Sequence, residues 1–209
     1  MTTRVKKLDQ IRILLRSRIT WFRSVLRRRG SEHLLKLIAL IVITLTILFS
    51  GCVGDQRHKL VISTTDQKMV LLDKGEAIAI YPVSTSKFGI GDRCGSCATP
   101  LGHFCIEKKI GQGVPLGTVF KNRKPTGEIL RPNAPGRDPI VTRILWLKGK
   151  ESQNKNAFAR YIYIHGTPEE ALLGQPKSFG CIRMSSSGVA QLYDIVGTGA
   201  KVEIIDRPL

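Results

Sequence analysis

Residues Tyr161–Met184 read YIYIHGTPEEALLGQPKSFGCIRM, and they hold most of the chemistry of this 209-residue chain. His165 ends an alternating run of aromatic and β-branched residues, which is a strand signal. Cys181 follows further along the chain and is preceded by Gly180. A cysteine nucleophile reacts as its thiolate, and an imidazole can take the thiol proton and return it to a leaving amine. The stretch therefore offers Cys181 as a candidate nucleophile and His165 as its candidate base.

Gly180 fits this chemistry because a residue without a side chain lets a substrate carbonyl approach the backbone, where amides can stabilise an oxyanion. The same residues also fit a buried structural cysteine and a histidine at a strand end. One Cys and one His that are distant in sequence fix no geometry. Residue chemistry alone leaves both interpretations open.

Outside this stretch, the chain contains short runs of β-branched and aromatic residues separated by Gly, Pro and Asn. Such runs predict strands, here over residues 60–63, 69–72, 77–83, 103–110, 140–147, 160–164 and 201–205. Two helices are expected. One begins at residues 167–170, where Thr is followed by Pro and Glu, and the other covers residues 185–196, whose apolar residues share one face. Residues 121–139 are dense in Pro, Gly and charge, and we expect a long exposed loop there. The predicted domain is mostly β with small helices.

The net charge of +17 suggests an anionic partner until its distribution is considered. Residues 1–36 contain 11 Lys and Arg against Asp9 and Glu32, so this basic arm accounts for +9 and the remaining chain for +8. Residues 37–54 follow as 18 residues without charge, about the length that crosses a bilayer. The basic arm therefore belongs to a membrane signal, and no nucleic-acid partner is expected.

Positive charge beside a first apolar segment stays in the cytoplasm, so we expect the chain after Cys52 to lie outside it. The segment 37–54 is either a retained transmembrane anchor or a lipoprotein-type signal, because FSGC at residues 49–52 is similar to a lipoprotein cleavage box. The expected organisation is a cytoplasmic arm (1–36), this membrane segment (37–54), short strands or a linker (55–76) and a catalytic domain (77–209).

Several ordered motifs resemble the L,D-transpeptidases of the YkuD type, bacterial enzymes that remodel peptidoglycan. Two of them are His165-Gly166-Thr167 after a strand and Ser178-Phe179-Gly180-Cys181-Ile182-Arg183. Upstream, YPVSTS at residues 81–86 and TPLG at residues 99–102 are similar to the strand and the turn that precede the site in this family. The resemblance extends over residues 77–205.

The resemblance implies a β-sandwich-like catalytic domain in which Cys181 accepts an acyl group and His165 is the general base. The thiolate would attack the carbonyl of the third residue of a stem tetrapeptide, release D-alanine and pass the acyl group to an amine. The amides of Gly180 and Cys181 are candidates for the oxyanion hole. Arg183 either braces its loop or meets substrate carboxylates. The residues expected to bind substrate or shape the site are Gly166, Ser178, Gly180 and Arg183.

Phe179 stands where the family has a histidine, and a phenyl ring neither donates nor accepts a proton. If His165 is the base, the reaction stays possible. If the missing histidine shared that role, the domain would be slow, altered in its acceptor, or a silent wall-binding module.

The remaining cysteines of the exported part pose a separate question. Cys94 and Cys97 form a Cys-x-x-Cys pair, and His103 and Cys105 would share one face of a strand. These four residues could ligate zinc, the cysteines could form a disulfide outside the cytoplasm, or they could remain free thiols. An envelope redox protein working through Cys94 and Cys97 is a weaker alternative, because no helical pattern follows the pair.

The sequence thus predicts a cysteine L,D-transpeptidase of the bacterial cell envelope that acts on peptidoglycan stem peptides, with an L,D-carboxypeptidase as the alternative. It needs no cofactor and contacts the membrane through residues 37–54.

Overall fold

The computed structural model of the chain describes residues 54–209. The basic arm, and the predicted membrane segment except for its last residue, lie outside the described residues. Within residues 54–209, no helix combines the length and the apolar character that crossing a bilayer requires.

The described chain is mostly β, as predicted. Its strands are β1 (His58–Ser63), β2 (Lys68–Asp73), β3 (Glu76–Pro82), β4 (Gly102–Ile110), β5 (Thr118–Lys121), β6 (Lys124–Ile129), β7 (Val141–Gly149), β8 (Tyr163–Gly166), β9 (Ile182–Met184) and β10 (Lys201–Ile205). One α-helix, α2 (Ser186–Ile195), and two short 3-10 helices, η1 (Ser152–Asn154) and η2 (Glu170–Leu172), complete residues 54–209. Six of the seven predicted strands are confirmed to within two residues at each end, and β10 matches its prediction residue for residue.

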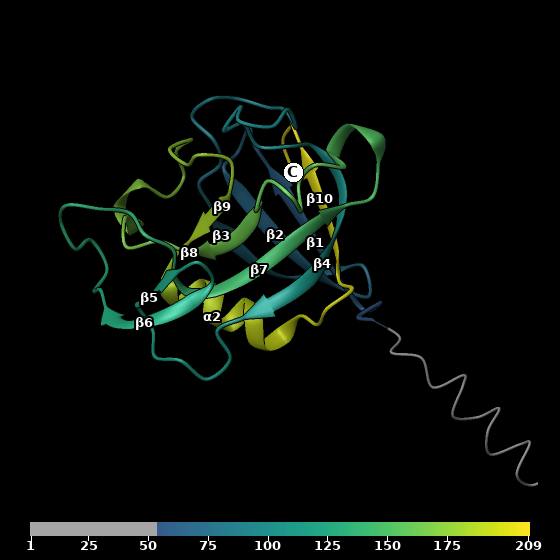
Figure 1. Cartoon of the computed structure of the whole chain (residues 1–209). Coiled ribbons are helices and arrows are strands. Elements are labelled where there is room, and N and C mark those ends of the chain that lie inside the picture. The colour runs from purple at the N-terminus through teal and green to yellow at the C-terminus, as the bar shows by residue number, and fades with distance from the viewer. Residues whose placement is uncertain (1–53) are drawn as a thin grey trace, which may run out of the picture. The chain divides into compact units, whose positions relative to one another are not determined.

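All ten strands form one hydrogen-bonded sheet, so the domain expected to be β-sandwich-like is built from a single sheet. The order along it is β3-β2-β1-β10-β4-β7-β5-β6, and β8 joins β7 to β9. Antiparallel pairs dominate, whereas β1 with β10 and β8 with β9 run parallel. The sheet bends around its interior, so that β3-β2-β1-β10 lie behind β4 and β7 (Figure 1).

The main core lies inside this bend. Its buried side chains come from β1, β2, β4, β7, β8, β9 and β10 and from α2, and they include Leu60, Ile106, Leu145, Ile164 and Ile204. One face of the sheet thus encloses the apolar interior, which leaves the opposite face of β7, β8 and β9 available for a site.

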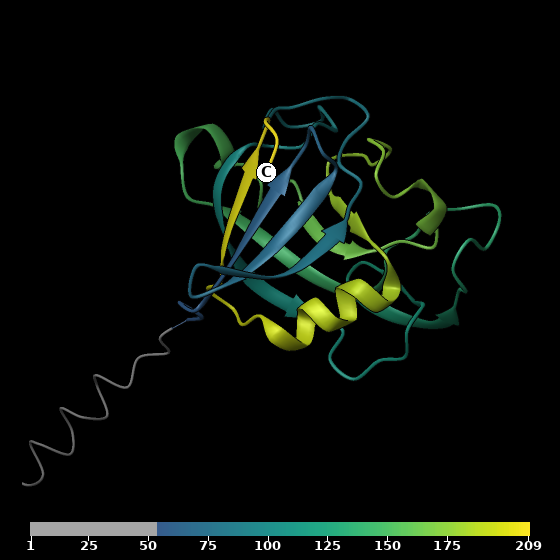
Figure 2. The ribbon, with the colours of Figure 1, turned by 180° about the vertical axis from the view of Figure 1, so that it is seen from behind.

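Helix α2 confirms the prediction for residues 185–196. Ser185 caps it by accepting a hydrogen bond from the amide of Gly188 at 3.1 Å, and Val189, Leu192 and Tyr193 face the core. The helix packs along one side of the bent sheet (Figure 2).

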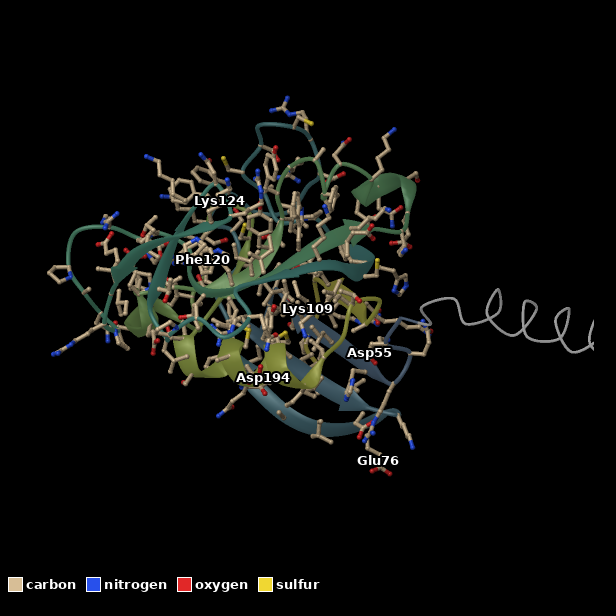
Figure 3. All side chains as sticks on the ribbon, turned by 60° about the horizontal axis from the view of Figure 1, so that its bottom comes forward. Asp55, Glu76, Lys109, Phe120, Lys124 and Asp194 are labelled. Atoms are coloured by element: carbon tan, nitrogen blue, oxygen red, sulfur yellow. The ribbon has the colours of Figure 1, made fainter. Side chains whose placement is uncertain are left out.

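Lys109 caps the C-terminal end of α2. Its ammonium donates to the carbonyls of Tyr193 and Val196, both at 2.6 Å, and it lies near Asp55 and Asp194 (Figure 3). Burial lowers the pKa of Lys109, while these two carboxylates act in the opposite direction. The lysine therefore satisfies carbonyls that the helix end leaves unpaired.

The long loop expected over residues 121–139 is partly wrong, because β6 lies within it and pairs with β5. Asn122 and Arg123 form the connecting turn with φ of 52° and 66°. Positive φ at both positions of a two-residue turn suits the twist of a hairpin. The hairpin was missed because β6 contains Pro125 and Gly127 and every residue of it is exposed, so it shows no apolar alternation.

Two other expectations are corrected around the central motif. Residues 167–170 do not begin an α-helix, since Thr167 bonds to Asp138 instead and only the 3-10 turn η2 follows. The strand predicted at residues 160–164 begins at Tyr163, because Tyr161 has a φ of 60°, outside the strand region.

Candidate active site

Strands β8 and β9 bring the candidate base and nucleophile to one face of the sheet. Ile164 pairs with Ile182 and His165 pairs with Arg183 in parallel register. Paired residues of neighbouring strands point to the same face, and side chains alternate along each strand. Ile164 and Ile182 therefore enter the core, whereas alternation directs His165 and Cys181, which directly precedes β9, to the opposite face.

The thiol of Cys181 is partly buried. It packs against an apolar cluster that contains Trp146, Phe158 and Tyr163, and it donates to the carbonyl of Tyr161 at 3.4 Å. Burial raises the pKa of Cys181 to about 11, although a backbone amide and the charge of Arg160 act in the opposite direction. The thiol is therefore protonated in the substrate-free site.

The imidazole of His165 is buried, with 5% of its surface exposed. Burial lowers the pKa of His165, so the ring is neutral near pH 7, while the carbonyl of Gly166 and the charge of Asp138 act against this shift. Nδ1 lies 2.8 Å from that carbonyl oxygen. A carbonyl only accepts, so Nδ1 carries the proton and Nε2 keeps a free lone pair.

Ser178 fixes the loop that carries the nucleophile. Its hydroxyl donates to the carbonyl of Cys181 at 2.6 Å and accepts from the amide of Gly180 at 3.2 Å. The Gly180 amide is therefore already engaged, so of the two amides that the sequence suggested for the oxyanion hole only that of Cys181 remains a candidate.

Two glycines permit close backbone approaches around the site. Gly180 has a φ of 115°, and a side chain there would lie 3.2 Å from the carbonyl oxygen of Ala98. A side chain on Gly166 would lie 2.7 Å from the carbonyl oxygen of Val141. Both positions need glycine for packing, so neither requires a substrate contact to explain it.

Arg183 lies beside the site but is buried, with 2% of its surface exposed. Its guanidinium donates to Asp138, to Glu169 at 2.8 Å and to the hydroxyl of Ser84 at 3.3 Å. Asp138 also accepts from Thr167, which follows the His-Gly pair. Through Asp138, Arg183 thus connects the segment around Cys181 with the His165-Gly166-Thr167 segment. Its guanidinium is occupied by these contacts and is not free to bind a substrate carboxylate.

The structure adds residues that sequence reasoning missed. Arg160 forms a buried ion pair with Asp92 at 3.0 Å and donates to the carbonyl of Ala98 at 2.7 Å, which braces the loop behind Gly180. Strand alternation could have placed Tyr163 beside His165, because both are in one short run. Asp92 and Arg160 gave no such signal, since only tertiary folding brings them together.

Cys94, Cys97, His103 and Cys105 do not assemble as the zinc alternative requires. Within residues 54–209, no group of three or more His, Cys, Asp or Glu side chains could hold a metal ion. Cys94, Cys97 and Cys105 are free thiols, so the disulfide alternative is absent from this structure as well.

The family profile and the curated relative that match this chain are both described as L,D-transpeptidases. The profile of the YkuD family, described as an L,D-transpeptidase catalytic domain, matches residues 57–204. A probable L,D-transpeptidase, ErfK/SrfK of Salmonella typhimurium, is 42% identical over 50 residues, which make up 24% of this chain and 16% of that protein.

Solved structures with a similar fold include two mycobacterial proteins. An L,D-transpeptidase from Mycobacterium smegmatis is 19% identical with a TM-score of 0.46, over 71% of this chain and 58% of that one. L,D-transpeptidase 3 from Mycobacterium tuberculosis is 16% identical with a TM-score of 0.47, over 72% and 61%. The chain thus spans about three fifths of these solved relatives.

Proposed function

The chain belongs to the YkuD family of L,D-transpeptidase catalytic domains, and we propose that it is an active cysteine transpeptidase of the bacterial cell envelope. Its substrates are peptidoglycan stem tetrapeptides, from which it releases D-alanine and forms cross-links. Residues 37–54 would hold residues 77–209, the catalytic part, at the membrane outside the cytoplasm, either as a transmembrane anchor or through a lipidated Cys52.

The observation that supports this proposal is the shared face of β8 and β9. His165 lies in β8 and Cys181 directly precedes β9, which pairs with β8 in parallel register, and strand alternation supports a common face for the two side chains. The hydrogen bond from Nδ1 to Gly166 leaves Nε2 of the imidazole as the proton acceptor. Nucleophilic acyl transfer needs a thiol and a base with a free lone pair on the same side of the sheet, which supports these roles for Cys181 and His165.

In the first half-reaction, Nε2 of His165 takes the proton from Sγ of Cys181, and the sulfur attacks the carbonyl between the third and fourth residues of the stem. The amide of Cys181 donates to the oxyanion. The imidazolium then protonates the nitrogen of D-alanine as the C–N bond breaks, which leaves a thioester on Cys181.

In the second half-reaction, an acceptor amine attacks the thioester, Nε2 of His165 takes up the amine proton, and that proton returns to the leaving sulfur. Water in place of the amine makes the product a tripeptide, which is the carboxypeptidase alternative. Because burial favours the neutral thiol and the neutral imidazole, the proton transfer is coupled to attack on the bound carbonyl.

The test uses the full-length protein, kept in solution with a non-ionic detergent, and a purified disaccharide-tetrapeptide. Intact-protein mass, free D-alanine and cross-linked dimer are followed for wild type, Cys181→Ala and Cys105→Ala. We expect the adduct and both products in wild type and in Cys105→Ala, whose thiol lies on β4, and none of them in Cys181→Ala.

Phe179 is the reason for the competing proposal, in which the domain binds the cell wall but is catalytically inactive. Its ring is 62% exposed and supplies no proton donor or acceptor to the site. If wild type forms no adduct and releases no D-alanine, the transpeptidase proposal fails and wall binding without chemistry takes its place. Tripeptide without dimer would identify the carboxypeptidase.

A redox function through Cys94 and Cys97 gains no support from the fold. The segment after Cys97 leads into β4, not into a helix, whereas a thioredoxin-like pair belongs at the start of one.

A further inference from the structure

Two exposed aromatic rings stand beside the nucleophile loop. The ring centroids of Phe88 and Phe179 are 5.5 Å apart at an interplanar angle of 51°, and the residues are 53% and 62% exposed. The ammonium of Lys87 lies 4.4 Å from the Phe179 centroid and 5.2 Å from that of Phe88. Grouped apolar side chains on a surface mark contact sites, so this cluster needs an explanation.

Backbone contacts hold the cluster in place. The amide of Lys87 donates to the carbonyl of Ser178 at 3.1 Å, and the amide of Phe88 donates to the hydroxyl of Ser86 at 2.9 Å. Ser178 in turn binds the carbonyl of Cys181. The rings are therefore presented at a fixed position relative to the nucleophile.

The charge of this surface has one sign. Residues 84–91 and 174–181 contain Lys87 and Lys177 and no Asp or Glu. Among the ion pairs of residues 54–209, none involves Lys87. The surface combines apolar rings with an ammonium group that is free to meet a carboxylate.

The cluster lies on one of two flanks of Cys181. Strand β8 borders β9 on one edge, and the segment that leads to Lys87 borders the other, through bridges from Ser84 to Arg183 and from Ser86 to Ser178. Transfer of an acyl group between two peptides requires two binding sites that meet at one sulfur.

The flank on the β8 side is the enclosed one. Cys181 packs there against Trp146 and Tyr163, and the guanidinium of Arg123, from the β5–β6 turn, lies 4.9 Å from the ring of Tyr161 and 5.4 Å from that of Trp146. The donor carbonyl, which must reach the partly buried sulfur, fits this side. The open flank remains for the second substrate.

We propose that Lys87, Phe88 and Phe179 form the acceptor-binding face, which takes a carboxylate-bearing stem peptide whose amine receives the acyl group. The inference rests on the proposed transpeptidation. A peptide carboxylate pairs with Lys87, and the apolar parts of the stem pack on the two rings.

The kinetic test measures the ratio of cross-linked dimer to hydrolysed tripeptide at a fixed concentration of a stem tripeptide with a free side-chain amine. For full-length Lys87→Ala and Phe179→Ala, we expect this ratio to fall about tenfold, as the loss of an ionic or stacking contact predicts. Lys68→Ala and Ile195→Ala, on exposed positions of β2 and α2, should keep the wild-type ratio. A wild-type ratio in Lys87→Ala and Phe179→Ala would overturn the inference.

A binding test separates this inference from the proposed chemistry. The same tripeptide is titrated calorimetrically into full-length Cys181→Ala, alone and combined with Lys87→Ala, and a methyl-esterified tripeptide is compared. We expect the dissociation constant to rise about tenfold on removal of either charge. If the tripeptide binds in this way but the wild type releases no D-alanine, the proposed enzymatic activity is wrong and the proposed binding face is supported. The proposed acceptor-binding face is wrong if the tripeptide does not bind, or if both protein variants bind both tripeptides equally well.

Discussion

Cys181 and His165 are both uncharged near pH 7, because burial raises the pKa of Cys181 to about 11 and lowers the pKa of His165. A thiol becomes charged when it loses its proton, so a raised pKa means that the thiolate of Cys181 forms only at higher pH. At pH 8, about one molecule in a thousand then carries the thiolate. We predict that iodoacetamide alkylates Cys181 with a rate that climbs through pH 9 and has a midpoint near 11.

Peptide mapping by mass spectrometry follows Cys181 separately from the other cysteines of the chain. A midpoint below about pH 7 would mean that the thiolate and the imidazolium form an ion pair at rest, and the coupled proton transfer proposed above would then be wrong.

The buried pair of Arg183 and Asp138 gives a prediction about stability. Their side chains are 3% and 22% exposed, and Asp138 also accepts from Thr167. Asp138→Asn leaves the buried guanidinium of Arg183 with Glu169 as its remaining carboxylate partner, and a hydrogen bond to a charged group contributes about 2 kcal/mol. We expect Asp138→Asn to lower the free energy of unfolding by about 2 kcal/mol in a denaturant titration.

The matched control is Glu128→Gln. Glu128 pairs with Arg137 at the surface, where both side chains are largely exposed, so solvent screens the pair and we expect no measurable change. Equal effects of the two substitutions would contradict the bracing role of Asp138.

The motifs predicted Cys181 and His165 as the reactive pair because the chemistry of each residue type restricts what it can do, and this assignment stays a prediction. They did not identify Asp138 or Arg160. Many arginines and aspartates are spread along the chain, and only the tertiary fold decides which of them become buried partners. The sequence also could not predict that the Gly180 amide donates within its own loop, since this hydrogen bond depends on where the Ser178 hydroxyl lies.

Helix α2 begins at a side-chain cap that can be removed without changing its core face. Ser185 accepts the amide of Gly188, and loss of an N-cap oxygen costs about 1 kcal/mol. We predict that Ser185→Ala lowers the free energy of unfolding by about that amount. Ser187→Ala, at an exposed position in the first turn, is the control and should change it far less, as measured by thermal or denaturant unfolding. No difference between the two variants would exclude the cap.

Strands with an apolar alternation were predictable, and so was α2, because each carries its burial pattern locally. The missed strands β5, β6 and β9 have four, six and three residues. Strand β9 exists through its pairing with β8, and β6 is exposed along its whole length. Short pieces of this kind are stabilised by partners that are distant in sequence, so no local pattern indicates them.

The fold of the described chain depends on its first strands. Strand β1 lies between β2 and β10, and Leu60 and Ile62 are fully buried. We predict that a fragment of residues 77–209 fails to unfold cooperatively, whereas residues 54–209 show one cooperative transition by circular dichroism. Loss of β1 and β2 removes core side chains and exposes an edge of β10. A cooperative transition in the shorter fragment would establish residues 77–209 as an independent domain.

The position of β10 has a consequence for biosynthesis. This strand follows all the other strands of residues 54–209, yet it lies between β1 and β4 in the middle of the sheet, with Lys59 opposite Lys201. A ribosome must therefore deliver Lys201–Ile205 before β1 and β4 can pair with β10, and contacts of such long range form slowly. Until then the sheet lacks one of its central strands, and a polypeptide that has not completed its fold is the form in which a chain can be threaded through a narrow translocation channel.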